Sequence, residues 1–159
     1  MTVARLIAVP PFVVAGPAQQ ASSAGEAAVE FSVVVPFHNP GATLRRAIER
    51  VAETLYAQNI SFEMIAVPGG TRDGSARTLD GLPWLRVIAD PELQDKGAAL
   101  QSGIAAAGGE WVGCIDVDAD METEIDPHEL IECLHRARET AAARETAARE
   151  TAAALAAAA

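Results

Sequence analysis

The sequence is poor in cysteine, in basic residues and in long apolar runs, and each shortage excludes a class of protein. Its two cysteines, Cys114 and Cys133, form no C-x-x-C pair and are too few for a disulfide framework. We therefore expect a reducing compartment, the cytoplasm, and a core position for Cys114 inside its apolar run. No uninterrupted apolar run reaches the about 18 residues of a membrane span, so no membrane span is expected.

Basic residues are scarce and scattered. Lysine and arginine total 12 against 22 acidic residues, the net charge is −10, and Lys96 is the only lysine. Because no basic cluster is present, neither nucleic acid nor an anionic membrane surface is an expected partner. A phosphate-bearing ligand would need a metal ion or positive dipoles to bind. At 159 residues, 50% of them hydrophobic, the chain is long enough for one domain with a single core.

The stretch GEWVGCIDVDAD (109–120) organises the chain. Its apolar part predicts a parallel strand covered on both faces, and Asp116, Asp118 and Asp120 follow that strand at alternating positions. Ligands of open α/β sheets gather at the carboxyl ends of strands, where Asp116 and Asp118 would hold a polyanion through Mg²⁺ or Mn²⁺. The alternative is that these aspartates cap the next helix or solvate a turn.

Strand-like and helix-like stretches alternate along the middle of the chain. The predicted elements are strands at 31–36, 62–67, 85–89 and 111–115, a helix capped by Thr43, and helices at 75–79 and 96–107. Such alternation predicts an α/β fold with a mainly parallel sheet sandwiched by helices, a Rossmann-like, nucleotide-binding layout. Right-handed crossovers would place the loops after the first, second and fourth strands along one edge of the sheet.

The N-terminal segment, residues 1–29, allows two interpretations. A signal peptide would use Arg5, the apolar stretch after it, and small residues near Ala21 and Ala24. A short edge strand followed by a flexible linker is the alternative that Pro10 and Pro11 favour, because paired prolines interrupt the apolar region.

The C-terminal segment, residues 137–159, repeats the letters R-E-T-A-A and is dominated by alanine. It predicts a solvated, fraying helix or a low-complexity extension that adds little core. In the helix before it, Asp126 is expected to be the N-cap and Pro127 the first helical residue. The main folded domain is therefore expected at 30–136.

Four segments, in order and in register, carry a family resemblance. They are FSVVVPFHNPGATLRRAI (31–48), FEMIAVPGGTRDGS (62–75), DKGAALQSGIAAAGGEW (95–111) and CIDVD (114–118). Together they resemble the N-terminal, nucleotide-binding half of an inverting family 2 glycosyltransferase with the glycosyltransferase A fold. The segments resemble, in turn, the family's P-x-x-N turn, its V-V-D-D-G-S-T-D-G-T loop, its lysine-glycine turn and its D-x-D. The resemblance covers about residues 31–134.

The resemblance implies a nucleoside-diphosphate sugar of UDP or GDP type as donor, and inverting transfer of the sugar to an acceptor hydroxyl. It implies a pocket for the base at Pro36, Phe37, His38 and Asn39, with Asp73 as a further residue of the donor site. Lys96 and Gly97 would contact the phosphates or the ribose, and Asp116 the ribose. Asp116 and Asp118 would bind Mg²⁺ or Mn²⁺. Considered without the resemblance, His38 is expected to be a polar turn residue, because no second histidine lies at ligand spacing, and Lys96 either caps a loop or contacts a phosphate.

Two departures from the family pattern bear on activity. Pro68 and Gly69 stand where the family has paired acids, and the first of these acids accepts a hydrogen bond from the base. Losing such a charge-assisted hydrogen bond costs about 1.5–3 kcal/mol, or one to two decades of affinity. The family's acceptor-binding half and general base would follow the D-x-D, so we expect a truncated chain. The acids and bases nearby, none in a matching motif, are Asp120, Glu122, Glu124, His128 and Glu129.

The sequence leaves two functions open. One is a metal-dependent glycosyltransferase, and the other is a catalytically inactive fragment or pseudoenzyme that keeps the fold. A weaker third is a nucleotidyltransferase-like binder of sugar nucleotides, which would want a basic loop after the first strand, whereas residues 37–41 contain no lysine or arginine. A sheet edge left open by the missing half would be a site of self-association.

Overall fold

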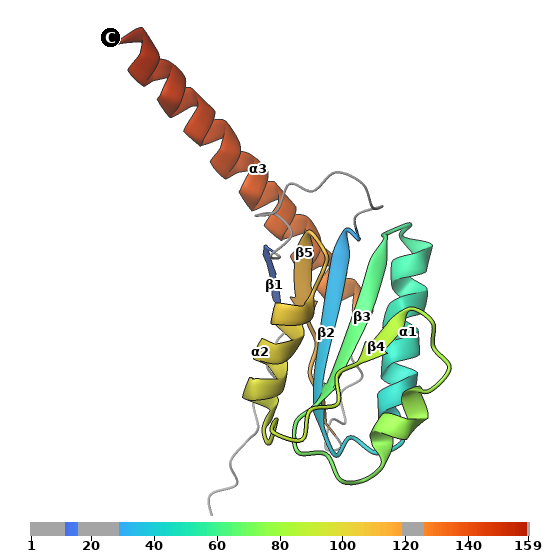
Figure 1. The fold of residues 1–159 in the computed structure, drawn as a ribbon. Helices are drawn as coiled ribbons and strands as arrows, with labels where there is room; N and C mark the ends of the chain where they lie inside the picture. The colour runs from blue at the N-terminus through green and yellow to red at the C-terminus, as the bar shows by residue number, and fades with distance from the viewer. Residues whose placement is uncertain (1–11, 16–28, 119–125, 159) are drawn as a thin grey trace, which may run out of the picture.

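The computed structural model describes residues 12–15, 29–118 and 126–158. Within them the chain forms a six-stranded sheet with helices on both faces (Figure 1). The strands are β1 (Phe12–Ala15), β2 (Phe31–His38), β3 (Phe62–Pro68), β4 (Leu85–Val87), β5 (Trp111–Cys114) and β6 (Val117–Asp118). The helices are α1 (Thr43–Ala57), the 3₁₀ helix η2 (Ser75–Leu79), α2 (Lys96–Ala106) and α3 (Pro127–Ala157).

The sheet has the order β1-β5-β2-β3-β4, and β6 continues the line of β5 along β2. β5, β2, β3 and β4 are parallel, and β1 pairs antiparallel with β5 at the edge. The predicted α/β fold with a mainly parallel sheet is therefore confirmed. The edge strand expected near the N-terminus is also confirmed, while the expected linker at residues 16–28 lies outside the described residues.

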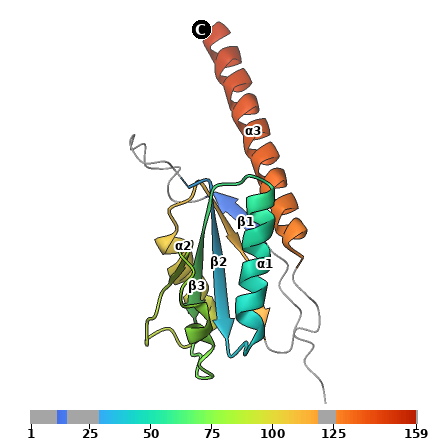
Figure 2. The same ribbon diagram turned by 90° about the vertical axis from the view of Figure 1, so that its right-hand side faces the viewer.

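Three layers make up the domain, with α2 on one face of the sheet and α1 and α3 on the other (Figure 2). Alternation along β2 directs Val34 to the α2 face and Val33 and Val35 to the α1 face, so both faces of this strand are fully buried. The larger core lies under α1 and α3, around Phe31 and Leu130. The expected core position of Cys114 is confirmed, and Trp111 in the same strand is buried as well.

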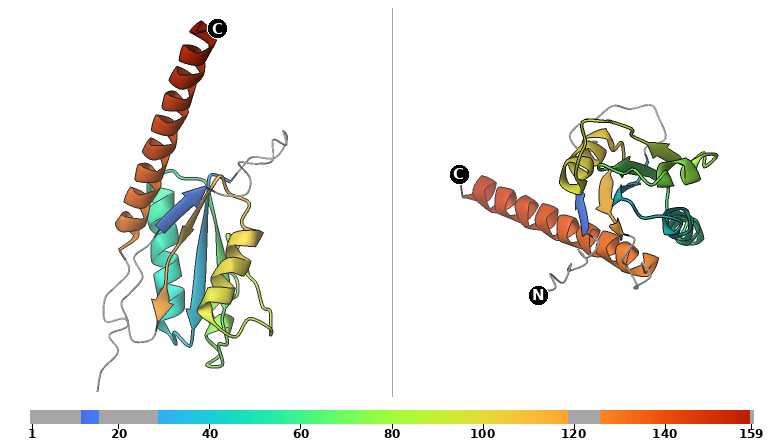
Figure 3. Two further views of the ribbon diagram at one scale, coloured as in Figure 1. Left: turned by 90° about the vertical axis from the view of Figure 1, so that its left-hand side faces the viewer. Right: turned by 90° about the horizontal axis from the view of Figure 1, so that it is seen from below.

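Helix α3 is continuous across the boundary expected at residue 137. Asp126 caps it by accepting a hydrogen bond from the His128 amide at 2.9 Å, and Pro127 begins it, as predicted. Its buried residues, Pro127, Leu130, Ile131 and Leu134, all belong to its first turns. Beyond residue 138 the helix is exposed and extends past the sheet (Figure 3), so the expectation of a solvated helix that adds little core is confirmed.

Some predicted element ends were wrong. Thr43 is the first helical residue and not the cap; Ala42 is the N-cap, and the Thr43 hydroxyl donates to the Pro40 carbonyl at 2.8 Å instead. β2 runs on to His38, and β4 already ends at Val87. Among the described residues, no helix is both long and apolar enough to cross a membrane.

Candidate functional site

The loops after β2 and β3, the N-terminus of α2 and the end of β5 meet at the carboxyl edge of the parallel sheet. Parallel strands with right-handed crossovers bring these segments to one side, as the sequence predicted. The side-chain hydrogen bonds that link these segments to one another join residues 20 to 34 positions apart in the chain.

A gap in the strand ladder positions Asp116. The Ile115 amide donates to the Val34 carbonyl at 3.1 Å, and the register pairs Phe37 with Val117 two residues beyond. Continued across the gap, this register puts Pro36 opposite Asp116. Because proline has no N–H, the ladder breaks here, which separates β5 from β6. The break explains why the strand predicted at 111–115 ends at Cys114.

Asp116 pairs with the lysine at the start of α2. The Lys96 Nζ donates to Asp116 Oδ1 at 2.6 Å, and the two side chains are 27% and 21% exposed. At this exposure the pair adds modest stability, but it does fix a carboxylate and an ammonium side by side at the strand end. Next to it, burial raises the pKa of the Cys114 thiol to about 12, with a smaller contribution from the Asp116 charge. Cys114 is therefore a protonated core residue and not a nucleophile.

The loops after β2 and β3 are joined by side-chain hydrogen bonds. The Asn39 Oδ1 accepts from the Arg72 amide at 2.8 Å, and the Asp73 Oδ2 accepts from the Gly41 amide at 2.8 Å. Asp73 also accepts from the Ser75 amide at 3.0 Å, and its pKa is lowered below the ordinary value of 3.8, first by the Ser75 side chain and then by the backbone hydrogen bonds from Ser75 and Gly41. The Asp73 carboxylate thus holds the two loops together.

His38 braces the same loops through its ring. Its Nδ1 lies 2.7 Å from the Gly69 carbonyl oxygen, which only accepts, so Nδ1 carries the proton and donates. In the neutral ring the other nitrogen, Nε2, then accepts from the Asn39 side-chain amide at 3.3 Å. Both ring nitrogens are thereby engaged in hydrogen bonds, although His38 is the last residue of β2 and not the turn residue that was predicted.

The loop after β3 packs tightly against residues 94–96. The Gly70 amide donates to the Leu93 carbonyl at 2.8 Å, and Gly70 has a positive φ of 71°. A Cβ atom built on Gly69 would lie 2.5 Å from the Asp95 carbonyl oxygen, and one on Gly70 would lie 2.6 Å from that of Gln94. Only glycine fits at both positions, so the second acid of the family's loop has no room in this backbone.

The remaining predicted site residues are placed as follows. Phe37 is fully buried in the core, and its carbonyl accepts from the Thr71 hydroxyl at 3.1 Å. Gly97 lies exposed in the first turn of α2. The Asp118 backbone pairs with His38, but its side chain lies outside what the structure describes. Asp120, Glu122 and Glu124 lie outside it altogether, and His128 and Glu129 are exposed at the start of α3.

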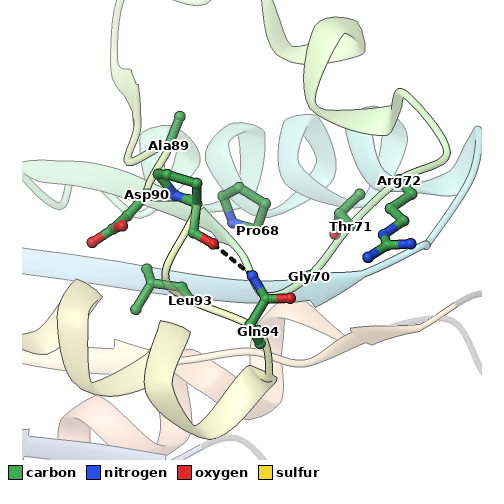
Figure 4. A pocket seen from close by; sticks show the side chains of 9 residues that line it. Pro68, Gly70, Thr71, Arg72, Ala89, Asp90, Leu93 and Gln94 are labelled. Atoms are coloured by element: carbon green, nitrogen blue, oxygen red, sulfur yellow. Dashed lines mark hydrogen bonds between the residues drawn. The ribbon is translucent and has the colours of Figure 1, made fainter.

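A cavity of about 330 Å³ opens between the loops after β3 and β4 (Figure 4). It is lined by Pro68, Gly70, Thr71, Arg72, Ala89, Asp90, Pro91, Leu93 and Gln94. None of these residues was predicted as a ligand contact from the sequence. The signal in the sequence that could have indicated this cavity is Arg72. It is a cation where the family pattern has threonine, and it lies in the same loop as the two missing acids.

The side chains at this edge of the sheet limit how a metal ion could bind. In the part of the chain that the structure describes, no three His, Cys, Asp or Glu side chains come together as metal ligands. Asp116 offers hard carboxylate oxygens at a place that already accommodates the Lys96 ammonium. These residues fit a Mg²⁺ or Mn²⁺ ion that takes its other ligands from water and substrate phosphates. They do not fit a metal site built from protein ligands alone.

The parallel sheet between helical layers, with its loops gathered at one edge, defines a nucleotide-diphospho-sugar transferase-like fold of the glycosyltransferase A type. The family model for glycosyl transferase family 2 matches residues 32–151. The chain therefore belongs to glycosyl transferase family 2.

Relatives of the chain carry glycosyltransferase names. An uncharacterized glycosyltransferase, sll0501, of Synechocystis sp. is 31% identical over 107 residues, 65% of this chain and 32% of that protein. Dolichyl-phosphate beta-glucosyltransferase ALG5C of Trichomonas vaginalis is 31% identical over 108 residues, 62% of this chain and 32% of its own length. The chain thus spans about a third of the length of these curated relatives.

Proposed function

We propose that the carboxyl edge of the sheet binds a nucleoside-diphosphate sugar in a metal-dependent manner, and that the sugar is transferred to an acceptor hydroxyl with inversion. The observation that carries the proposal is the meeting of all four family-like segments at this edge, where Asp116 and Lys96 lie 2.6 Å apart. A site for a diphosphate needs both a cation-binding carboxylate and positive charge, and this pair supplies them.

Each residue has a role in the proposed donor site. The Lys96 ammonium and the first amides of α2 face the phosphates, since a helix N-terminus favours anions. The hydrogen bonds of Asn39 and Asp73 hold the loops after β2 and β3 together, so less conformational entropy is lost when a ligand binds there. When bound at Asp116 and Asp118, Mg²⁺ or Mn²⁺ supplies Lewis-acid stabilisation of the leaving diphosphate.

A second candidate function is a donor-binding chain without turnover. The observation that favours it is the loop after β3, where Pro68 and Gly69 replace the paired acids and Gly69 has no room for a side chain. A general base for the acceptor hydroxyl is not identified among the described residues. Both candidate functions include binding of the donor, but only the first includes transfer of the sugar.

Calorimetric titration with UDP, GDP and UMP, each with and without Mn²⁺, tests the proposed donor site. We expect the diphosphates to bind at least tenfold more tightly with Mn²⁺ than without it, and UMP to gain much less, because the ion would offset the larger negative charge of a diphosphate. Asp116→Asn should abolish the Mn²⁺ effect, and Asp80→Asn, an exposed aspartate at the end of η2, should preserve it.

Lack of binding by every nucleotide at millimolar concentration would exclude both candidate functions. The second candidate function, donor binding without turnover, would be supported if a nucleotide binds with the metal but no sugar is released from the matching donor with any of a range of acceptor hydroxyls.

A further inference from the structure

The cavity beside Pro68 has the size and the position of a nucleobase site. Pro68 ends β3 and lies where the family pattern places the acid that meets the base. At about 330 Å³ the cavity is at the small end of ligand pockets, enough for a base but not for a whole sugar nucleotide.

The hydrogen-bonding groups at this cavity differ from those of a site built around a carboxylate. Proline and glycine at positions 68 and 69 offer no side-chain acceptor, and Arg72 offers a guanidinium, which only donates. The Thr71 hydroxyl is already engaged, since it donates to the Phe37 carbonyl and accepts from the Asn39 amide. The main donor left to a ligand is therefore the guanidinium fork of Arg72.

Gln94, on the loop after β4, supplies an acceptor to the same cavity. Its Nε2 donates to the Pro91 carbonyl at 2.5 Å, which orients the side-chain amide and presents Oε1 as its acceptor. Gln94 and Arg72 lie on either side of Gly70, whereas the Asp90 carboxylate points away from both (Figure 4). Asp90 Oδ1 also accepts from the Glu92 amide at 2.9 Å, within its own turn.

We propose that Arg72 and Gln94 determine base specificity and that this cavity selects a cytosine nucleotide, an inference that rests on the proposed donor site. Cytosine presents two adjacent acceptors, N3 and O2, to a two-pronged guanidinium and an amino N–H to the Gln94 oxygen. Uracil places an N–H between its two carbonyls, so it cannot offer the fork two adjacent acceptors. Guanine also offers two acceptors, O6 and N7, with its N1–H donor next to O6, so GDP is the most demanding competitor in the test.

Competing titrations of CDP, UDP, GDP and ADP into the full chain at one Mn²⁺ concentration test the inference. We expect CDP to bind about tenfold more tightly than the other three, the effect of one additional charge-assisted hydrogen bond. Arg72→Met should remove this preference, and the control Arg77→Met, an exposed arginine of η2 outside the cavity lining, should keep it. Pro68→Asp should shift the preference toward UDP, because a carboxylate accepts from the uracil N–H.

The possible outcomes separate this inference from the proposed function. If UDP, GDP or ADP binds more tightly than CDP and still requires Mn²⁺, the donor site stands and the cytosine preference is wrong. If Arg72→Met and Arg77→Met behave alike, Arg72 does not set specificity. If no nucleotide binds, the donor site itself is wrong, and the base preference falls with it.

Discussion

Gly69→Asp is expected to destabilise the fold by about 3 kcal/mol, although aspartate is the residue that the family pattern has at this position. A Cβ on Gly69 would lie 2.5 Å from the Asp95 carbonyl oxygen, 2.6 Å from the Asp95 carbonyl carbon and 2.9 Å from the Lys96 amide nitrogen. All three are backbone atoms, which cannot rotate away as a flexible side chain does. The start of α2, and with it Lys96, would have to move.

Pro68→Asp is the matched control, because it introduces the same charge one position earlier. Pro68 is partly exposed and lines the cavity, so an aspartate there has space, and we expect a change of no more than about 1 kcal/mol. Urea unfolding of both variants measures the difference. If Gly69→Asp unfolds at the same urea concentration as Pro68→Asp, the loop is not held against residues 94–96 as described.

Leu130→Ala should lower the free energy of unfolding by about 2–5 kcal/mol, the usual range for a leucine deleted from a full core. Leu130 is 0% exposed in the core between α3 and the sheet, and its Cδ1 would lie 3.1 Å from a Cβ on Gly113 of β5. Leu155→Ala removes the same atoms from the same helix at a position that is 69% exposed. It should change stability by less than about 0.5 kcal/mol.

Urea unfolding followed by circular dichroism compares the two leucine variants under identical conditions. Equal destabilisation by Leu130→Ala and Leu155→Ala would contradict the placement of α3, because it would mean that the far end of the helix packs as closely as its first turns.

The strands and the edge that gathers the loops were predictable because their signals are local. The β-branched run before Pro36 and the apolar run before Asp116 each specify a buried strand, and short loops between strands and helices imply parallel pairing. The N-cap of α3 was predictable for the same reason, since Asp126 directly precedes Pro127. The prediction that Thr43 is the N-cap of α1 was wrong, because its hydroxyl donates to the carbonyl three residues before it. The sequence pattern does not show which of these two local hydrogen bonds forms.

The details of the site depend on contacts between segments far apart in the chain. The collision that keeps Gly69 a glycine comes from Asp95, and the partner of Lys96 is Asp116, 20 residues later. Neither contact can be predicted from the residues that neighbour Gly69 or Lys96 in the sequence. The cavity near Arg72 and Gln94 likewise exists only once the loops after β3 and β4 lie side by side.

The central claim is that the carboxyl edge of the sheet holds a metal-bound nucleoside diphosphate. The most direct measurement is paramagnetic broadening of backbone amide resonances by Mn²⁺ in the presence of CDP or UDP. We expect selective broadening at residues 38, 39, 41, 69–72 and 96–97, with much weaker broadening there when Mn²⁺ is added alone or when Asp116→Asn is used. Broadening that ignores the nucleotide, or that spares this edge while other acidic segments broaden, would contradict the claim.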